Sequence, residues 1–327
     1  MKILVLGAGG FLGRRLAIAL GAAGSLRGQP ITAMTLADLA APETVEAPCP
    51  VATRALDITD PGAVAAIAAE GADVIYHLAA VVSGQAEAEF DIGMAVNLHG
   101  CLHVFEGARQ SGRVPLLIFT SSIAVFGGAM PYPIPDATYL NPQTSYGTQK
   151  AAAELLLSDY SRKGFVDGRG LRLPTISVRP GKPNKAASSF FSSIFREPLQ
   201  GEPANCPVDP DFEHWFLSPR RCIENLLHAA EIDAEAFGTD RCLTLNGRAH
   251  RIRDMVEAMR RVAGDAPVER ITWERDPVIE AIVYGWPRRF EAEKAARLGF
   301  TADESFEDNL RFFLEDDIEP ASRRTAP

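Results

Sequence analysis

The sequence is poor in cysteine and has no pair of cysteines spaced to form a metal or redox site. Five cysteines occur in 327 residues, at positions 49, 101, 206, 222 and 242, an odd number without a C-x-x-C motif. This pattern argues against a disulfide framework and a zinc site, and it is typical of reduced thiols in the cytoplasm. We therefore expect a cytoplasmic protein.

Long apolar runs and basic runs are also absent. No stretch reaches the ~18 apolar residues that a membrane helix requires. The apolar run over residues 3–6 breaks at Gly7, too early for a secretory signal peptide. The net charge of -9, without a basic cluster, argues against nucleic-acid binding. Apolar residues make up 46% and charged residues 23%, as in soluble globular proteins with one or two domains.

The first half of the sequence alternates regularly between predicted strands and helices. Short apolar runs predict strands at 3–6, 31–36, 51–56, 73–78, 116–120 and from 170 onward. Helices are predicted between them at 11–23, 61–70, 93–110 and 145–163. This alternation is typical of a doubly wound α/β fold with a parallel sheet, so we predict a Rossmann domain over residues 1–178.

The pattern changes after Pro180. Residues 180–210 show no clear period, and further helices are predicted near 219–232, 251–263 and 303–314. A strand at 241–245 could return to the main sheet. We expect residues 179–317 to form a smaller, mainly helical part that binds the substrate. Residues 318–327 have no apolar pattern and are expected to be disordered.

Three glycines, Gly7, Gly10 and Gly13, follow the first predicted strand and open the first predicted helix. Glycines in this context permit a tight turn and let backbone N–H groups approach a pyrophosphate at the helix N-terminus. Phe11 and Leu12 belong to the same turn. The turn therefore predicts a dinucleotide site, although a glycine-rich turn without a ligand has the same pattern.

Acidic residues follow the second and third predicted strands. Asp38 comes after the second strand, and no arginine follows it closely. A carboxylate there can hold the ribose hydroxyls of NAD and repel the extra phosphate of NADP, although a turn aspartate looks the same. Asp57 and Ile58 follow the third strand, where they could contact the adenine. We expect NAD as the cofactor.

Tyr146 and Lys150 lie four residues apart in a predicted helix, so their side chains share one face. A nearby ammonium lowers the pKa of a phenol, which lets the tyrosine exchange a proton with a substrate hydroxyl near neutral pH. A serine at the end of the preceding strand, within residues 120–122, could hold the same oxygen. Such a pair alone also occurs on ordinary exposed helices. In order with the serines and the glycine turn, it predicts hydride transfer coupled to proton transfer.

Together these motifs resemble the extended short-chain dehydrogenase/reductases, the NAD-dependent epimerase/dehydratase group, over about the first 180 residues. Segments 77–80 and 121–127 and Asn97 add to the resemblance. It implies a homodimer in which Ser122, Tyr146 and Lys150 are catalytic. It also implies cofactor contacts from Gly7, Gly10, Phe11, Leu12, Gly13, Asp38, Asp57, Ile58, Leu78, Ala79, Ala80, Asn97, Tyr146, Lys150, Pro174, Thr175 and Ile176.

The segment over residues 172–184 is similar to the D-erythronate dehydrogenase branch, whose members oxidise C2 of a four-carbon sugar acid with NAD. It differs from the Asn-Val-Tyr-Gly-Pro-like segment of enzymes that act on nucleotide sugars. Arg220 and Arg221 likewise stand where those enzymes usually carry an acidic pair. We therefore expect oxidation of a small sugar acid, with substrate contacts from Ser122, Tyr146, Thr175 and Arg179.

Arg179 could grip a carboxylate bidentately, with added charge from Lys182 or Lys185, although arginines on loops are often solvated surface cations. His99 and His103 share a helix face, but no third ligand accompanies them, so no metal is expected. The roles of His214 and Trp215 stay open. Two alternatives stand beside the dehydrogenase: a nucleotide-sugar epimerase or dehydratase with tightly bound NAD, and an NAD-binding regulatory protein without turnover.

Overall fold

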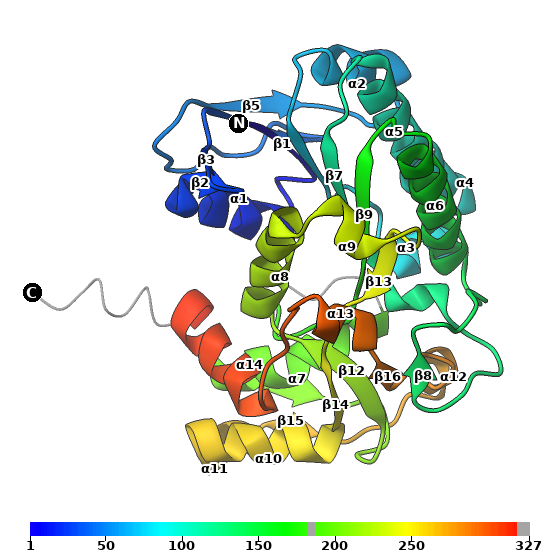
Figure 1. The fold of residues 1–327 in the computed structure, drawn as a ribbon. Coiled ribbons are helices and arrows are strands. Elements are labelled where there is room, and N and C mark those ends of the chain that lie inside the picture. The colour runs from blue at the N-terminus through cyan, green and yellow to red at the C-terminus, as the bar shows by residue number, and fades with distance from the viewer. Residues whose placement is uncertain (182–186, 319–327) are drawn as a thin grey trace, which may run out of the picture.

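The computed structural model describes residues 1–181 and 187–318. The expectations for Lys182, Lys185 and residues 319–327 lie outside this part of the chain. A seven-stranded parallel sheet forms the centre of the molecule, in the order β13-β9-β7-β6-β1-β4-β5 (Figure 1). Its strands are β1 Lys2–Leu6, β4 Ala33–Asp38, β5 Val51–Ala55, β6 Val74–His77, β7 Leu116–Ser122, β9 Asp167–Leu173 and β13 Cys242–Thr244. The predicted doubly wound α/β fold is confirmed.

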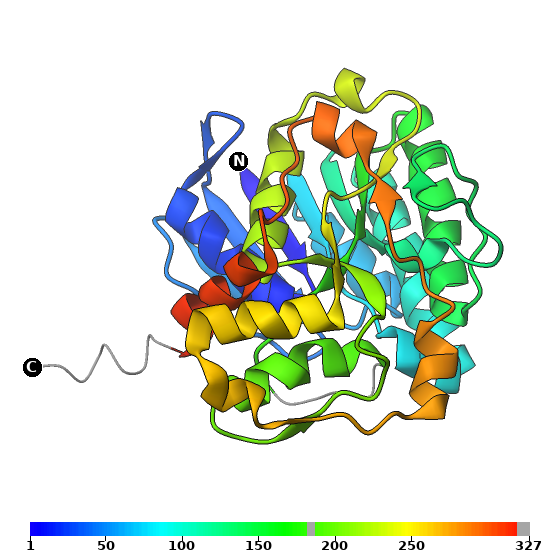
Figure 2. The ribbon, with the colours of Figure 1, turned by 90° about the horizontal axis from the view of Figure 1, so that it is seen from below.

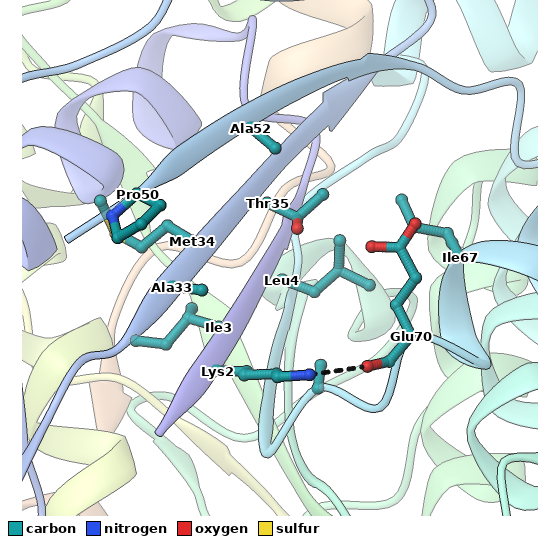
Figure 3. A pocket seen from close by; sticks show the side chains of 11 residues that line it. Lys2, Ile3, Leu4, Ala33, Met34, Thr35, Pro50, Ala52, Ile67 and Glu70 are labelled. Atoms are coloured by element: carbon teal, nitrogen blue, oxygen red, sulfur yellow. Dashed lines mark hydrogen bonds between the residues drawn. The ribbon is translucent and has the colours of Figure 1, made fainter.

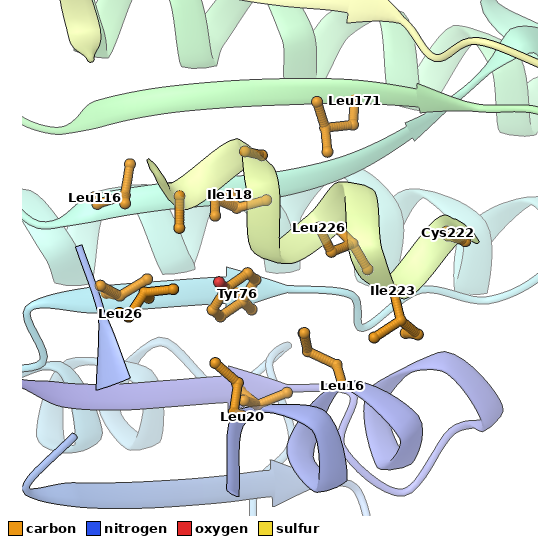
Figure 4. Packing of buried hydrophobic residues seen from close by; sticks show 14 of the residues in the cluster. Leu16, Leu20, Leu26, Tyr76, Leu116, Ile118, Leu171, Cys222, Ile223 and Leu226 are labelled. Carbon is orange, nitrogen blue, oxygen red and sulfur yellow. The ribbon is translucent and has the colours of Figure 1, made fainter. Parts of the chain in front are cut away.

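Helices cover both faces of the sheet. On one face lie α1 Phe11–Ala23 and α8 Pro219–Glu231, and on the other α2 Pro61–Ala68, α5 Cys101–Gln110 and α6 Ser145–Arg162. Figure 4 shows the first face, where Leu20 of α1 and Leu226 of α8 pack against Tyr76 in β6. The strands read as near-continuous apolar runs because both of their faces are buried.

The strand order reverses between β1 and β6. From β1 the strands follow outward to β4 and β5, and from β6 they follow in the opposite direction to β7, β9 and β13. In open parallel sheets, ligands bind at the carboxyl ends of the strands at this switch point. The turn after β1 and the turn after β6 touch there. A Cβ on Gly7 would lie 2.6 Å from the backbone nitrogen of Ala79.

A second sheet, in the order β10-β12-β14, begins just beyond the carboxyl end of β9. Its strands are β10 Thr175–Ile176, β12 Glu213–Leu217 and β14 Arg248–Arg251, and the helices around it are α7 Phe190–Leu199, α10 Ile252–Ala263 and α14 Phe306–Phe313. Figures 1 and 2 show α7 and α10 on the side of the molecule away from α2 and α5. Phe191, Phe195 and Met259 form the centre of this smaller core.

The smaller part contains one further helix, α7, that is not predicted from the sequence. Helix α7 lies within residues 180–210, a region without a clear overall period in which Phe190, Phe191 and Phe195 nevertheless recur at helical spacing. Its buried face includes Phe190, Phe191 and Phe195, and all three side chains belong to the hydrophobic core of the smaller part. The apolar residues at 190, 191, 194, 195, 198 and 199 recur at helical spacing, but the helix is short and Pro198 stands near its end, so its bounds are not evident from the sequence.

The remaining elements are short. They are β2 Ser25–Leu26, β3 Gln29–Pro30, α3 Ser83–Ala88, α4 Phe90–Gly93, the π-helix η1 Met94–Gly100, η2 Ile123–Val125, β8 Ile134–Pro135, η3 Ala187–Ser189, β11 Ala204–Asn205, α9 Ala234–Phe237, α11 Asp265–Val268, β15 Ile271–Thr272, α12 Pro277–Val283, β16 Phe290–Glu291, α13 Glu293–Arg297 and η4 Leu314–Ile318. No helix among the described residues is long and apolar enough to span a membrane.

A hollow of about 230 Å³ lies between β1, β4, β5 and α2 (Figure 3). Lys2 begins β1 at its rim and donates to the carbonyl of Glu70 at 3.3 Å. Small side chains, Ala33 and Ala52 among them, leave the space. None of the residues predicted to bind cofactor or substrate lines it, so the candidate site lies elsewhere, at the carboxyl ends of the strands.

A buried ion pair fastens α6 to the sheet. The Arg172 guanidinium on β9 donates to both carboxylate oxygens of Glu154 on α6, and the closest N–O distance is 2.7 Å. The Ser121 hydroxyl, on β7, donates to the same carboxylate. The two charged side chains are only 8% and 3% exposed, so each depends on the other for compensation of its charge.

Removal of one partner of this pair should therefore destabilise the fold strongly. We expect Arg172→Met to lower the free energy of unfolding by about 3–5 kcal/mol, because it leaves a buried carboxylate without a counter-charge. Arg162→Met is the matched control, since Arg162 pairs with Asp159 at the surface with side chains 71% and 56% exposed. It should cost about 1 kcal/mol or less. Urea unfolding measures both, and equal losses would contradict a special role for the buried pair.

Candidate active site

The glycine turn is shaped so that only glycines fit. Gly7 has a φ of 85°, in the left-handed region. A Cβ on Gly13 would lie 2.0 Å from the carbonyl oxygen of Gly7. Gly10 is the N-cap of α1, and no side chain caps the helix or places an acid in its first turn. The turn therefore offers backbone N–H groups and the positive end of the helix dipole to an anion.

Asp38 stands beside this turn at the end of β4. Its carboxylate accepts hydrogen bonds from the backbone N–H of Gly9 at 2.9 Å and of Leu39 at 2.7 Å. These contacts orient the carboxylate next to the glycine turn. This is the position from which an acidic group holds the ribose of a dinucleotide, and it is equally the geometry of a turn aspartate.

The other predicted cofactor residues of the first half also gather at this edge. Asp57 follows β5 and accepts from the N–H and hydroxyl of Thr59 at 2.9 and 2.8 Å. Ile58 is buried, whereas Leu78 and Ala79 are half-buried directly after β6. Strands β6, β1, β4 and β5 are adjacent in the sheet, and their carboxyl ends lie at the same edge. Asp57, Ile58, Leu78 and Ala79 therefore lie at the same edge of the sheet as the glycine turn.

Ser122 and Tyr146 are hydrogen-bonded to each other through their side chains. Ser122 ends β7 and accepts from the N–H of Ala124 at 3.1 Å. Helix α6 approaches this point very closely, because a Cβ on Gly147 would lie 2.1 Å from the carbonyl oxygen of Ala124. The sequence Tyr146-Gly147 thus brings the phenol to the end of β7.

Lys150 lies behind the tyrosine on the same helix face. Its Nζ donates to the carbonyl of Thr120 at 2.9 Å and lies 5.8 Å from the centroid of the Tyr146 ring. The Phe119 ring is closer, at 4.7 Å. The lysine is fully enclosed and only 2% exposed. The structure therefore places Ser122, Tyr146 and Lys150 close together at the carboxyl end of β7.

The sequence predicts a lowered pKa for Tyr146, and this prediction is wrong. Burial raises the pKa of Tyr146 to about 12, and the hydrogen bond from Ser122 opposes this shift only in part. Burial also lowers the pKa of Lys150 to about 8. The ammonium lies against the tyrosine ring and the Thr120 carbonyl. Loss of hydration is therefore the largest influence on the pKa of Tyr146, and the phenol is protonated at neutral pH.

Asn97 connects the turn after β6 with α6. Its Oδ1 accepts from the N–H of Val81 at 2.9 Å, and its Nδ2 donates to the Val81 carbonyl at 3.2 Å and to Gln149 Oε1 at 2.9 Å. Gln149 directly precedes Lys150, so Asn97 supports the helix that carries the tyrosine and the lysine. The helix predicted at 93–110 is confirmed, but residues 94–100 within it form a π-helix around Asn97. π-Helical segments are rare in proteins, and those that occur are frequently found at functional sites.

The residues after β9 differ in exposure. Pro174 and Ile176 are buried, whereas Thr175 and Arg179 are half-buried. Nη2 of Arg179 donates to the Ser188 carbonyl at 3.3 Å, and within residues 1–181 and 187–318 no carboxylate pairs with it. Burial, and secondarily the charge of Arg196, lower the pKa of Arg179. A half-buried guanidinium without a carboxylate partner is well suited to bind an anionic group of a ligand.

Two further features bear on the sequence interpretation. The Thr175 hydroxyl is hydrogen-bonded to Nε2 of His214 at 2.7 Å, a contact that no sequence pattern indicates, since the residues lie 39 positions apart. Arg220, one of the arginines in place of an acidic pair, binds Glu315 and Asp316 of the same chain. Among the described residues, no group of three or more His, Cys, Asp or Glu is arranged to hold a metal.

Comparison with known proteins identifies relatives over nearly the whole chain. The NAD dependent epimerase/dehydratase family model matches residues 3–214. D-erythronate dehydrogenase of Cupriavidus necator is 50% identical over 321 residues, covering 97% of this chain and 98% of that protein. D-erythronate dehydrogenase of Haemophilus influenzae is 40% identical over 318 residues, covering 97% and 100%.

Solved structures are similar too. One described as the nucleoside-diphosphate-sugar epimerase from Agrobacterium tumefaciens has a TM-score of 0.93 at 47% identity, over 97% of this chain and 94% of that chain. The GalE-like L-threonine dehydrogenase from Cupriavidus necator has a TM-score of 0.84 at 26% identity, over 97% and 99%. The whole chain, including its smaller part, thus shares the architecture of these enzymes.

The buried lysine generates a testable pH dependence of stability. The pKa of Lys150 is lowered from 10.5 to about 8 by burial. Between these values the unfolded chain binds more protons at this lysine than the folded protein does, so stability rises with pH. We therefore expect the free energy of unfolding of the native protein, relative to Lys150→Met, to increase between about pH 8 and pH 10.5. Urea unfolding at several pH values measures it. Lys163→Met, on the exposed C-cap of the same helix, is the control. A constant difference across this window would contradict the burial of a charged lysine.

Proposed function

The chain belongs to the NAD dependent epimerase/dehydratase family, and on that premise we propose that it is an NAD-dependent dehydrogenase that oxidises the C2 hydroxyl of D-erythronate. The observation that carries the chemistry is the hydrogen-bonded pair Ser122 and Tyr146, with Lys150 behind it, at the carboxyl edge of the sheet. The substrate is supported by the relatives named D-erythronate dehydrogenase, which match the chain from end to end.

The residues around the glycine turn fit a dinucleotide. The uncapped N-terminus of α1 can receive the pyrophosphate on the backbone of Gly10, Phe11 and Leu12. Asp38 can accept the ribose hydroxyls, and its charge disfavours a 2′-phosphate, so NAD is preferred to NADP. Asp57 and Ile58 would contact the adenine, residues 78–80 would lie close to the cofactor, and the backbone of residues 174–176 would contact the carboxamide of the nicotinamide.

The chain's own residues handle the proton. Tyr146 accepts the proton of the C2 hydroxyl as general base, and Ser122 donates a hydrogen bond to the same oxygen. Lys150 favours the phenolate by its charge and holds the ribose next to the nicotinamide. When bound, NAD supplies the hydride acceptor and a positive charge that favours the phenolate, against the burial that raises the tyrosine pKa.

Arg179 is the proposed contact to the substrate carboxylate. It is half-buried and lacks a carboxylate partner among the described residues, and its neighbour Arg196 adds to the positive potential. A guanidinium can bind a carboxylate through two parallel hydrogen bonds. We further propose that the enzyme is a cytoplasmic homodimer.

A nucleotide-sugar epimerase is the second candidate, because a structure with that description resembles this one along its length. The same serine, tyrosine and lysine would serve it, with NAD reduced and reoxidised in each cycle. Net formation of NADH therefore separates the two functions. An NAD-binding regulatory protein would show no reaction with either substrate.

The function is tested by incubating the protein with NAD and D-erythronate and following NADH absorbance. We expect net NADH with the native protein. Tyr146→Phe should lower the rate by ~10² to 10⁴, because the general base is lost while the ring still packs. NAD affinity should stay close to the native value. Native protein that forms no NADH with sugar acids but converts nucleotide sugars without net NADH would establish the epimerase instead.

The role of Arg179 is tested by substitution. We expect Arg179→Met to raise the KM for D-erythronate about ten- to a hundredfold, because a charge-assisted bidentate contact is lost. Arg179→Lys should recover only part of this loss, since an ammonium lacks the planar fork. Arg220→Met is the matched control, because Arg220 already pairs with Glu315 and Asp316. An unchanged KM in Arg179→Met would exclude the arginine from substrate binding.

A further inference from the structure

The pair formed by Thr175 and His214 lies where the two sheets meet. Strand β10 begins two residues after β9 ends, so Thr175 stands at the carboxyl edge of the central sheet. His214 comes from β12, which pairs in parallel with β10. Nε2 of the histidine and Oγ1 of the threonine are 2.7 Å apart. Thr175 is half-buried, whereas His214 is only 1% exposed.

Aromatic rings fix the orientation of the histidine. The His214 ring lies parallel to Phe191, with an interplanar angle of 1° and a centroid distance of 5.0 Å. Phe216 meets it edge-on at 5.3 Å, and Trp286 approaches it at 5.7 Å. Close packing of this kind leaves the ring little freedom to rotate. Nε2 is therefore held toward Thr175.

The position of the ring proton follows from the surroundings. Burial, and secondarily the charge of Arg288, lower the pKa of His214 to about 3, so the ring is neutral and carries one N–H. Nδ1 is buried and has no hydrogen-bond partner in residues 1–181 and 187–318. A buried N–H without an acceptor is rarer than an unused acceptor. The proton therefore belongs on Nε2, which donates it to Thr175 Oγ1.

A threonine that accepts from the histidine has its own hydroxyl proton left to donate. We propose that His214 is a positioning residue that makes Thr175 a hydrogen-bond donor to the carboxylate of the sugar acid. A carboxylate only accepts hydrogen bonds and accepts them more strongly than a neutral oxygen. The pair would thus favour an acid over a neutral analogue. This inference rests on the proposed oxidation of a sugar acid at this site.

Two substitutions test the pair without altering the predicted catalytic residues. Thr175→Val keeps the shape and removes the hydroxyl, and His214→Phe keeps a ring within the aromatic cluster and removes the donor. We expect each to lower kcat/KM for D-erythronate about ten- to a hundredfold, mainly through KM. Thr175→Ser should retain most of the native value. Because the expected cofactor contact of residues 174–176 is made by their backbone, NAD affinity should stay near the native value in each variant, as should the urea unfolding midpoint.

The double variant decides whether His214 acts through Thr175. If it does, Thr175→Val combined with His214→Phe should be no worse than Thr175→Val alone. Losses that multiply in the double variant would overturn the proposal, because His214 would then act independently of the threonine. The preference for D-erythronate over its neutral amide should narrow in both single variants. An equal loss on acid and amide would exclude the carboxylate as the partner.

Failure of this proposal is distinguishable from failure of the proposed function. If the native protein forms NADH with D-erythronate and both variants match it, only the Thr175–His214 proposal fails. If the native protein forms no NADH with any sugar acid, the proposed function fails first and takes the carboxylate contact with it.

Discussion

The contact between helix α6 and the end of strand β7 is the constraint on which the rest of the site depends. Gly147 lets the helix touch the Ala124 carbonyl, Lys150 donates to Thr120, and one turn further on Glu154 binds Ser121 and Arg172. These contacts occur along a single helix face at spacings of three or four residues. The same face that carries the tyrosine and the lysine is therefore the face that anchors the helix. The proposed catalytic geometry and the stability of the fold therefore depend on one set of interactions, which includes two buried charges that each need a partner.

The second requirement is that turns from neighbouring strands meet at the switch point of the sheet. Gly7 lies against Ala79, and Gly9 lies against Asp38, so three separate connections form one surface. Each contact leaves no room for a Cβ or very little, which explains why glycine occupies these positions. Asn97 extends the arrangement, because its amide links the turn after β6 to Gln149, beside the lysine. The proposed cofactor edge and the helix that carries Tyr146 and Lys150 are in this way parts of one hydrogen-bonded framework.

The smaller part completes the site from the opposite direction. Its sheet starts where β9 ends, and its aromatic core of Phe191, Phe216 and neighbouring rings surrounds His214. A polar ring inside an apolar core is stable only if it is neutral and hydrogen-bonded, and His214 meets both conditions through burial and Thr175. Arg179, four residues after Thr175, belongs to the same segment and donates from Nη2 to the carbonyl of Ser188. The placement of these polar groups suits a small, negatively charged substrate.

The sequence alone determined the doubly wound fold, the glycine turn and the grouping of Ser122, Tyr146 and Lys150. These features depend on local periodicity, on short spacings within one helix or turn, and on the rule that parallel strands end at a common edge. Only the tertiary structure decided the state of the groups and their distant partners. Burial reversed the expected shift of the tyrosine pKa, because desolvation depends on every element packed around the ring. The π-helix around Asn97 and the pairing of Thr175 with His214 likewise depend on contacts between residues far apart in the chain. The periodicity of a sequence shows which residues share one face of a helix or strand. It does not show which residues of another element that face contacts.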